Sequence, residues 1–370
     1  MRILSFLLSG CEYGKIIGGA ERRFFQVSEH LRNLGVEILA LEYESLHSEK
    51  WGQPSYFPIK IKRRFPNHAI LSASRIVVLG LIACIKYRCQ IIYVTCRLAW
   101  AEGSLTGLII PYIVSCLCKK PLVIIFHHVT PSDYMERHPI RLQAYRKATC
   151  MAVSEATAND IKKCFRIKNV VVVGNGVDLD LFKTVDYMEE KYDAVFLGRI
   201  TKEKGIFVLL RTWKDVISEI PSAQLLLIGG IDRNIKEELR KTIQELQLKQ
   251  NVTVTGFVSD RRMLQLLSAS KIFVLPSKME GFGLSVAEAM AAGLPCVLSN
   301  LPALKENFDS AAVFVEPEDA EGFAQAILTL LSDPEKCREL REKGQKLVRQ
   351  FSWDSVAKKE LKIFRSVLEK

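Results

Sequence analysis

Short, continuous apolar runs recur along the whole chain, separated by longer segments in which apolar residues return every three or four positions. Apolar runs of about four to eight residues bounded by Gly, Pro or polar clusters are typical of buried strands, and the longer period is typical of helices. Their regular alternation predicts parallel sheets with crossover helices, an α/β fold. The predicted strands are 3–8, 37–41, 91–95, 122–127, 149–153 and 170–173 in the first half, and 194–198, 224–228, 253–255, 272–275, 296–299 and 312–314 in the second.

Two domains are expected, because 370 residues suffice for two complete cores at roughly 150 residues per domain. The boundary is expected near residues 174–186, where the last strand of the first half gives way to a polar segment. We therefore predict doubly wound domains at 1–175 and 176–351. A final helix over 352–370 is expected after the break around Ser352.

Charge is distributed unevenly between the two halves. The hydrophobic fraction of 48% and the charged fraction of 25% are those of a folded soluble protein. Residues 1–175 contain 24 Lys and Arg against 12 Asp and Glu, giving +12, whereas residues 176–370 contain 28 against 29, giving −1. A basic surface is therefore expected on the first half, and a nucleic acid, an anionic membrane or an acidic acceptor would each explain it.

The N-terminus and the cysteines indicate a reducing compartment. Met1–Leu8 runs directly into the first predicted strand, so no signal peptide is expected and the site should face the cytoplasm. The ten cysteines form no CxxC pair and lie mostly in apolar runs, which predicts reduced core residues. Cys116 and Cys118 are interpreted as packing residues and not as metal ligands.

The most informative segment is EGFGLSVAEAMAAGLP at 280–295, which follows a predicted buried strand. Gly281 and Gly283 allow close approach of the backbone to a ligand. The apolar helix that follows would present free amides to a diphosphate at its N-terminus. Glu280 lies before this helix and is free to meet sugar hydroxyls, whereas Glu288 lies within it and is expected to be buried against polar partners.

A second cluster, GRITKEKG at 198–205, also follows a predicted strand and supplies two cations. Arg199 offers a planar fork for phosphate oxygens and Lys204 a mobile point charge, so the pair suits a diphosphate leaving group. Lys202 and Glu203 are interpreted as ordinary surface charges.

Two further segments come from the first half. IIGGAERRF at 16–24 places Gly18 and Gly19 at the start of a helix over 20–34 that ends at Gly35; a plain turn is the alternative, and no GxGxxG fingerprint is present. The strand in PLVIIFHHVTP at 121–131 delivers His127 and His128 to its carboxyl end. A histidine there is able to bind a sugar hydroxyl or a phosphate, although lone histidines are often structural.

AVSEAT at 152–157 and GNGVD at 174–178 have simple structural explanations as well as functional ones. Ser154 is a natural N-cap for a helix beginning at Glu155, and its backbone would also be near a ligand. Asn175 and Gly176 suit a left-handed turn at a hinge. Asp178 and Asp180 form a DxD string, but we do not interpret it as a metal site, because Arg199, Lys204 and helix N-termini already provide for phosphate.

These segments follow one another in an order that resembles the retaining glycosyltransferases of family 4 (glycosyl transferases group 1). The two glutamates separated by seven residues, with GFGL after the first and AMAAGLP after the second, carry the resemblance, and GRITKEKG, GGAE and NGVD extend it along nearly the whole chain. The resemblance implies a GT-B fold, with two Rossmann-like domains facing a cleft. It also implies that residues 352–370 cross back to the N-terminal domain.

The resemblance further implies transfer of a hexose from a UDP- or GDP-sugar with retention of configuration, and no other cofactor. Arg199 and Lys204 would stabilise the leaving group, and Glu280 would hold sugar hydroxyls. The remaining implied contacts are Glu288 with the ribose, His127 with the sugar near the reacting carbon, the amides of Phe282, Gly283 and Leu284 with sugar and phosphate, and the Gly18–Gly19 loop with the donor. His128 stands where the family more often has aspartate, which leaves the acceptor contacts open.

The acceptor and the base of the donor stay undetermined by sequence. A glycan or lipid-linked acceptor in polysaccharide, glycolipid or glycoprotein glycan synthesis is expected from the resemblance and the basic first half. Segments 60–88 and 107–120 are basic and apolar, and either lie on an anionic membrane surface at the inner face of the membrane or form buried helices. Alternatives of a different class are a GT-B protein that binds sugar nucleotide without transfer, and a nucleic-acid binder, for which no recognised motif is present.

Overall fold

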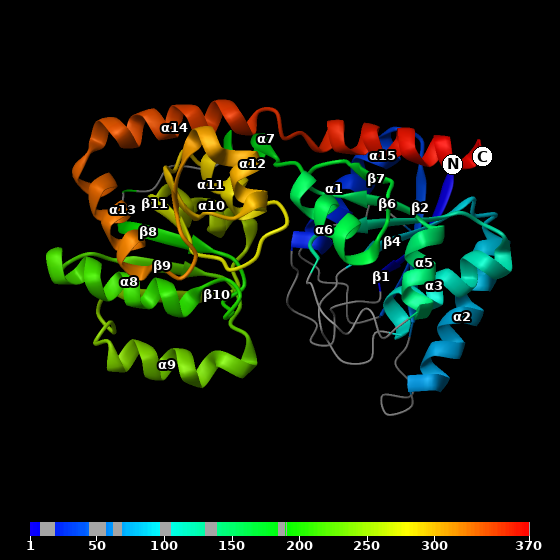
Figure 1. The fold of residues 1–370 in the computed structure, drawn as a ribbon, viewed down its shortest axis with the longest axis horizontal. Helices are drawn as coiled ribbons and strands as arrows, with labels where there is room; N and C mark the ends of the chain where they lie inside the picture. Colours follow the sequence, from blue (N-terminus) through cyan, green and yellow to red (C-terminus); the bar gives the residue numbers. More distant parts are fainter. Residues whose placement is uncertain are drawn as a thin grey trace. The chain divides into compact units, whose positions relative to one another are not determined.

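The structure is a computed structural model that describes residues 1–7, 19–43, 57–61, 69–96, 105–129, 139–183, 189 and 191–369. The chain divides into two compact units (Figure 1). Unit 1 comprises Met1–Gly176 and Trp353–Lys370, and unit 2 comprises Val177–Ser352. The division therefore falls between Gly176 and Val177, and the last helix belongs to the first unit.

Unit 1 contains a seven-stranded parallel sheet in the order β3-β2-β1-β4-β5-β6-β7. Its strands are β1 (Arg2–Leu7), β2 (Glu37–Tyr43), β3 (Phe57–Ile61), β4 (Ile91–Cys96), β5 (Leu122–Phe126), β6 (Thr149–Ala152) and β7 (Val170–Val172). The winding direction reverses between β1 and β4, so the sheet is doubly wound as predicted. All six strands predicted for this half are present.

Strand β3 was not predicted, because its sequence FPIKI lacks the continuous apolar run of a buried strand. It pairs only with β2 at the edge of the sheet. Edge strands tolerate proline and lysine because one side of their backbone needs no partner, which accounts for Pro58 and Lys60. The first two residues of the basic segment KIKRRF thus belong to β3, and residues 62–65 lie outside the described part of the chain.

Six helices of the described chain cover this sheet: α1 (Gly19–Asn33), α2 (Ala69–Lys86), α3 (Leu105–Cys118), α5 (Pro139–Lys147), α6 (Glu155–Phe165) and α15 (Trp353–Leu368). Right-handed crossovers place α1 on one face and α2, α3 and α5 on the other. Helix α15 packs against α1. Gly35, just after α1, has a φ of 81°, as expected of a helix C-cap. Within the described residues, no helix combines the length and the apolarity needed to cross a bilayer.

Unit 2 contains a six-stranded parallel sheet in the order β10-β9-β8-β11-β12-β13, and all six predicted strands are present. The strands are β8 (Tyr192–Leu197), β9 (Leu225–Ile228), β10 (Val252–Gly256), β11 (Ser270–Leu275), β12 (Cys296–Ser299) and β13 (Ala312–Val315). The helices are α7 (Leu179–Lys183), α8 (Ile206–Glu219), α9 (Lys236–Glu245), α10 (Asp260–Ser268), α11 (Leu284–Ala291), α12 (Pro302–Phe308), α13 (Ala320–Ser332) and α14 (Pro334–Val348), with 3-10 turns at Arg233–Ile235 and Asp309–Ala311.

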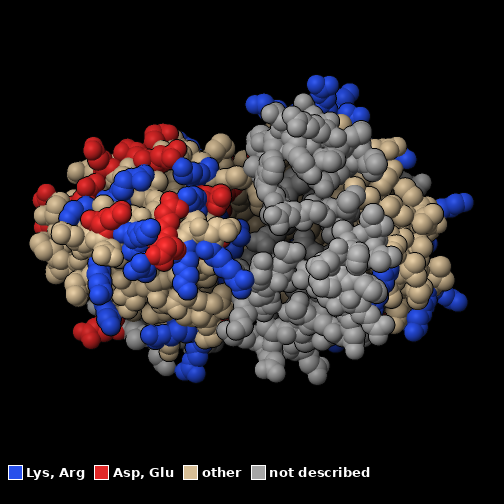
Figure 2. Space-filling view, turned by 90° about the horizontal axis from the view of Figure 1, so that it is seen from below, with Lys and Arg blue, Asp and Glu red and all other residues tan. Residues whose placement is uncertain are grey.

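On the face drawn in Figure 2, the described surfaces of the two units differ in their charged residues. In Figure 2 the described surface of unit 2, on the left, carries Lys, Arg, Asp and Glu together. The described surface of unit 1, on the right of this view, shows Lys and Arg at its margins and uncharged residues between them.

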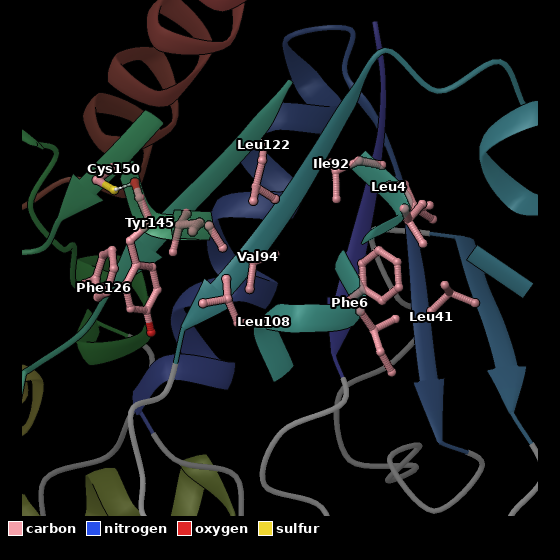
Figure 3. Packing of buried hydrophobic residues seen from close by; sticks show 14 of the residues in the cluster. Leu4, Phe6, Leu41, Ile92, Val94, Leu108, Leu122, Phe126, Tyr145 and Cys150 are labelled. Carbon is pink, nitrogen blue, oxygen red and sulfur yellow. Dashed lines mark hydrogen bonds between the residues drawn. The ribbon is translucent and has the colours of Figure 1, made fainter. Parts of the chain in front are cut away.

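The core of unit 1 on the α2, α3 and α5 side is continuous and densely packed (Figure 3). Phe126 and Phe165 pack against the ring of Tyr145, at centroid distances of 5.2 and 4.9 Å. The thiol of Cys150 donates to the Tyr145 carbonyl, which fixes the end of α5 beside β6. Cys150 is buried as predicted, but Cys116 is exposed, because it falls on the outer side of α3. Its assignment to the core was wrong.

A buried ionic network fastens α15 to the rest of unit 1. The Arg23 guanidinium of α1 and the Glu360 carboxylate of α15 are both fully buried and lie 2.6 Å apart. Arg23 Nε also donates to Asn175 Oδ1 at 2.8 Å, and the Tyr93 hydroxyl donates to Glu360 at 3.2 Å. Helix α1, strand β4, helix α15 and the segment leaving β7 therefore share one polar cluster.

Candidate donor site

The two motif loops of unit 2 lie side by side at the point where the winding of the sheet reverses. Strands β8 and β11 are paired neighbours, the chain moves from β8 outward to β9, and it moves from β11 outward to β12. Residues 198–205 follow β8, and residues 276–283 follow β11. Ligands of open α/β sheets bind beyond the carboxyl ends of the strands at such a reversal.

Close backbone contact locks these two loops together. Gly205 has a φ of 71°, and a Cβ at this position would lie 1.8 Å from the Pro276 carbonyl oxygen. The Lys278 amide donates to the Glu203 carbonyl at 2.8 Å. The loop after β8 therefore rests on the end of β11, and only glycine fits at the contact.

This contact brings Lys204 and Glu280 together. The Lys204 Nζ lies 2.5 Å from Glu280 Oε1, and the side chains are 25% and 9% exposed. Ser277 Oγ donates to the same carboxylate oxygen at 2.9 Å, and the Lys204 amide donates to Thr201 Oγ1 at 3.3 Å. The predicted cation and carboxylate thus form one hydrogen-bonded unit. Sequence reasoning missed both the pair and Ser277, whose only signal is its place at the end of a buried strand.

Arg199 and Glu203 complete the loop after β8. Arg199 is exposed and lies two residues after the end of β8. The pKa of Glu203 lies below its usual range, because a backbone amide and the Thr201 hydroxyl donate to its carboxylate, with further help from the charges of Arg199 and Lys204. Glu203 therefore stays ionised beside these cations and offsets one of the three positive charges that Arg199, Lys202 and Lys204 give the loop.

Helix α11 follows the second loop, and no side chain caps the backbone amides at its N-terminus. Gly283 has a φ of 94° and no side-chain cap, and α11 starts at Leu284. The Phe282 ring is buried and packs on Phe308 and Phe351, at centroid distances of 6.0 and 5.2 Å. Phe282 therefore anchors the turn through its side chain and leaves only its backbone for a ligand.

Glu288 lies one turn into α11 and is half-buried. The expectation that it is buried was wrong, because α11 packs on its sheet through the neighbouring positions Val286, Ala287 and Met290. A half-exposed carboxylate on this helix is accessible to a hydroxylated ligand without a large desolvation cost.

In unit 1, His127 and Ser154 follow the paired strands β5 and β6 at one edge of the sheet. His127 is 9% exposed. Ser154 is buried and caps α6 as predicted, since its Oγ accepts from the Thr157 amide at 3.0 Å. Gly19 is the first residue of α1, and Gly18 lies outside the described residues.

The prediction of a left-handed turn at Asn175 and Gly176 was wrong. The left-handed residue is Gly174, with a φ of 80°. Asn175 is buried and accepts from Arg23, and a Cβ on Gly176 would lie 2.6 Å from the Trp353 backbone. These two residues thus serve the packing of α15 and the polar cluster behind it.

Asp178 and Asp180 have a local structural role. The Asp178 carboxylate accepts from the Asp180 amide at 3.2 Å, just at the start of α7. Across the described ranges, no group of three or more His, Cys, Asp or Glu side chains is arranged to hold a metal ion.

Comparison with known proteins identifies the family. The family model described as Glycosyl transferases group 1 matches residues 179–347, and that of Glycosyltransferase Family 4 matches residues 17–181. Together they cover most of the chain, which therefore belongs to the group 1 glycosyltransferases of family 4. The expected family and the GT-B fold are confirmed.

Relatives support this assignment at moderate identity. The chain is 25% identical over 246 residues to an uncharacterised glycosyltransferase of Methanocaldococcus jannaschii, covering 62% of each chain. It is 29% identical over 247 residues to the α-maltose-1-phosphate synthase of Mycobacterium tuberculosis, covering 59% of this chain and 62% of the relative. The matches thus span about three fifths of the length of these relatives.

A solved structure of similar fold is that of Anabaena HepE in complex with UDP and glucose. Its TM-score is 0.79 at 18% identity, covering 99% of this chain and 100% of HepE. At this identity the likeness concerns the fold alone.

Replacing Gly205 by alanine should separate the two loops. The new Cβ cannot coexist with the Pro276 carbonyl, so Lys204 moves away from Glu280. A displacement of about 1 Å at a reacting centre costs on the order of 100-fold in rate, and we expect a loss of that size in kcat/KM for the donor. Donor turnover and the thermal unfolding midpoint would be measured together.

Gly35→Ala is the matched control. Gly35 has a similar φ of 81°, and no atom lies within 4 Å of its would-be Cβ. It should lose only about 1 kcal/mol of stability from the left-handed backbone, with unchanged activity. Equal activity of the two variants would show that the Gly205 contact does not position Lys204.

Proposed function

We propose that this chain transfers a hexose from a nucleoside diphosphate sugar to a glycan or lipid-linked acceptor, with retention of configuration and without a metal. The observation that carries the proposal is the Lys204–Glu280 pair beside the N-terminus of α11, at the reversal of the sheet. The family assignment and a neighbour of the same fold solved with UDP and glucose support it.

The leaving group is met by two cations of the loop after β8 and by the backbone amides at the N-terminus of α11. Lys204 and Arg199 take the diphosphate oxygens as the bond between the anomeric carbon and the phosphate oxygen breaks. The amides of Phe282, Gly283 and Leu284 orient sugar and phosphate at the helix pole. A bound diphosphate shares Lys204 with Glu280, so the ammonium lies where negative charge develops. Two cations and a helix pole thus supply what a metal would otherwise provide.

Glu280 acts as a ligand for sugar hydroxyls and not as a nucleophile. Its Oε1 already accepts from both Ser277 and Lys204, which lowers its nucleophilicity and orients the second oxygen. In the proposed reaction the acceptor hydroxyl attacks the face from which the diphosphate departs. The departing phosphate oxygen takes the hydroxyl proton, so configuration is retained without a covalent intermediate. Glu288 binds the ribose, and His127 contacts the sugar.

Our proposal for the acceptor substrate rests on the positive charge of unit 1. The basic unit 1 suits an acceptor in polysaccharide, glycolipid or glycoprotein glycan synthesis at the inner face of the membrane, and we propose no nucleic-acid partner.

Hydrolysis and binding of a panel of UDP- and GDP-sugars in EDTA test the proposal. We expect slow release of one nucleotide by the wild-type chain and its loss in Glu280→Ala and Lys204→Ala. Binding without turnover would favour the alternative of a non-catalytic sugar-nucleotide-binding protein once acceptors have been supplied. Absence of binding to every donor, or strict dependence on a divalent cation, would contradict the proposal.

A further inference from the structure

Helices α2 and α3 expose a row of aliphatic side chains. Val78, Ile82 and Ile85 of α2 are 53%, 52% and 73% exposed, and Ile113 and Leu117 of α3 are 37% and 62% exposed. The spacings of three and four residues place each set on one face of its helix. Single exposed aliphatic residues are ordinary, but a contiguous set marks an interaction surface.

The two rows belong to one surface, because α2 packs directly against α3. The opposite sides of both helices pack in the hydrophobic core, where Ile76 and Ala83 of α2 and Val114 of α3 are buried. The expectation that these segments form buried helices is therefore correct only in part, because each helix buries one side and exposes an apolar one. We call the exposed set, Val78, Ile82, Ile85, Ile113 and Leu117, the α2–α3 surface.

Basic residues collect at one end of this surface. Consecutive parallel crossovers bring the carboxyl ends of α2, α3 and α5 to the edge where the strands begin. Exposed cations stand there, namely Lys86, Arg88, Lys119, Arg146 and Lys147. In the described stretches 69–96, 105–129 and 139–154, the sequence has eight Lys and Arg and no Asp or Glu.

We propose that the α2–α3 surface docks on an anionic lipid bilayer, with the aliphatic residues at the level of the acyl chains and the cations among the headgroups. Aliphatic side chains beside lysine and arginine match the two layers of such an interface. A nucleic acid would use the cations but gains nothing from Ile82, Ile85 and Leu117. If a second copy of this chain docked here through the same surface, the cations of both copies would be brought together with no acidic residue to offset their repulsion.

The proposed docking surface and the candidate ligand-binding residues of unit 1 lie at opposite ends of the strands of its sheet. The cations stand where the strands begin, whereas His127 and Ser154 stand where β5 and β6 end. Docking therefore leaves those residues uncovered. The inference does not depend on the proposed transfer reaction, although a lipid-linked acceptor would be met at such a surface.

Cosedimentation of the 370-residue chain with vesicles tests the aliphatic part. Phosphatidylcholine vesicles with and without phosphatidylglycerol are compared, and we expect binding to the anionic vesicles that weakens with salt. Each inserted aliphatic side chain contributes about tenfold, so Ile85→Glu with Leu117→Glu should lower the partition coefficient about 100-fold or more. Leu368→Glu on α15 is the matched control, since Leu368 is 40% exposed outside the surface, and its binding should be unchanged.

A charge series tests the basic part. Neutralising one cation near an anionic surface lowers binding about fivefold, so Lys86→Gln with Lys119→Gln should lower it about 25-fold. Lys359→Gln with Lys362→Gln, exposed on α15, should leave it unchanged. Circular dichroism and the thermal midpoint verify that every variant is folded.

Three results would overturn the inference: no binding of the wild type to anionic vesicles, equal binding by the surface and control variants, or a wild-type dimer that the Glu variants convert to monomer. Nucleotide-sugar hydrolysis without vesicles is measured on the same samples and should be unaffected by the surface variants. Vesicle binding by a chain that neither binds nor hydrolyses any donor would contradict the proposed function alone, and hydrolysis without vesicle binding would contradict the docking surface alone.

Discussion

Lys204→Ala should lower kcat for sugar transfer or donor hydrolysis by about 10²- to 10³-fold, the usual loss when one preorganised charge is removed from a developing anion. The ammonium is held 2.5 Å from Glu280, and the fit of Gly205 against Pro276 fixes its loop. It is therefore already in place when the phosphate oxygen acquires charge and needs no reorganisation. Nucleotide release from the preferred donor in EDTA, with kcat and KM determined separately, measures the effect.

The control for this experiment lies two residues away. Lys202 is 55% exposed and pairs with Glu238 at 2.6 Å on the surface. Lys202→Ala removes the same charge from the same loop, so a general electrostatic effect on donor binding would appear in both variants, mainly in KM. A kcat loss in Lys204→Ala alone supports leaving-group stabilisation, whereas equal losses in both variants would remove Lys204 from that role.

Arg23→Ala should destabilise unit 1 by about 3–5 kcal/mol, because it leaves the Glu360 carboxylate buried without its counter-charge. Asn175 and the Gly174 carbonyl lose their donor in the same step. The lost contact is the one between α1 and α15, so α15 should open first. Hydrogen exchange of α15 peptides, followed by mass spectrometry alongside denaturant unfolding, measures both the local and the global change.

The double variant Arg23→Met with Glu360→Leu distinguishes destabilisation by an unpaired buried charge from destabilisation by lost packing. It removes both charges and keeps apolar volume, so it should be much less destabilised than either single variant, with a coupling energy of a few kcal/mol. Arg338→Ala, which breaks an exposed pair with Glu335, should have no measurable effect. Additive losses in the double variant would show that the network does not hold α15 as a unit.

Local pattern predicted most of the fold, because central strands of parallel sheets are buried on both faces and read as continuous apolar runs. The strand over 272–275 and the strand over 122–127 were found in this way. Strand β3 escaped because an edge strand needs no such run. Helix ends were predicted where the signal is chemical and local, as at Ser154 and Gly35.

Side-chain partners were not predicted, because they join residues far apart in the chain. Lys204 and Glu280 are 76 positions apart, and Arg23 and Glu360 are 337 apart. The motifs named Lys204 and Glu280 as separate ligands of the donor, and only the neighbouring position of β8 and β11 made them a pair. Asn175 was wrongly assigned to a left-handed turn for the same reason. Asparagine is common in turns, but here the hydrogen bond from Arg23 holds Asn175 in the interior.

The sequence by itself determined the alternation of strands and helices, the two-domain GT-B class, the family and the motif residues of the donor loops. The alternation follows from periodicity and short-range chemistry, which depend on covalent neighbours, whereas the GT-B class, the family and the motif residues follow from the resemblance of the motifs to family 4. The tertiary structure alone decided which charges pair, which glycine carries the left-handed turn, and which sides of α2 and α3 face outward. Those outcomes depend on strand order and helix packing, and an apolar helix has the same period whether one side or both sides are covered.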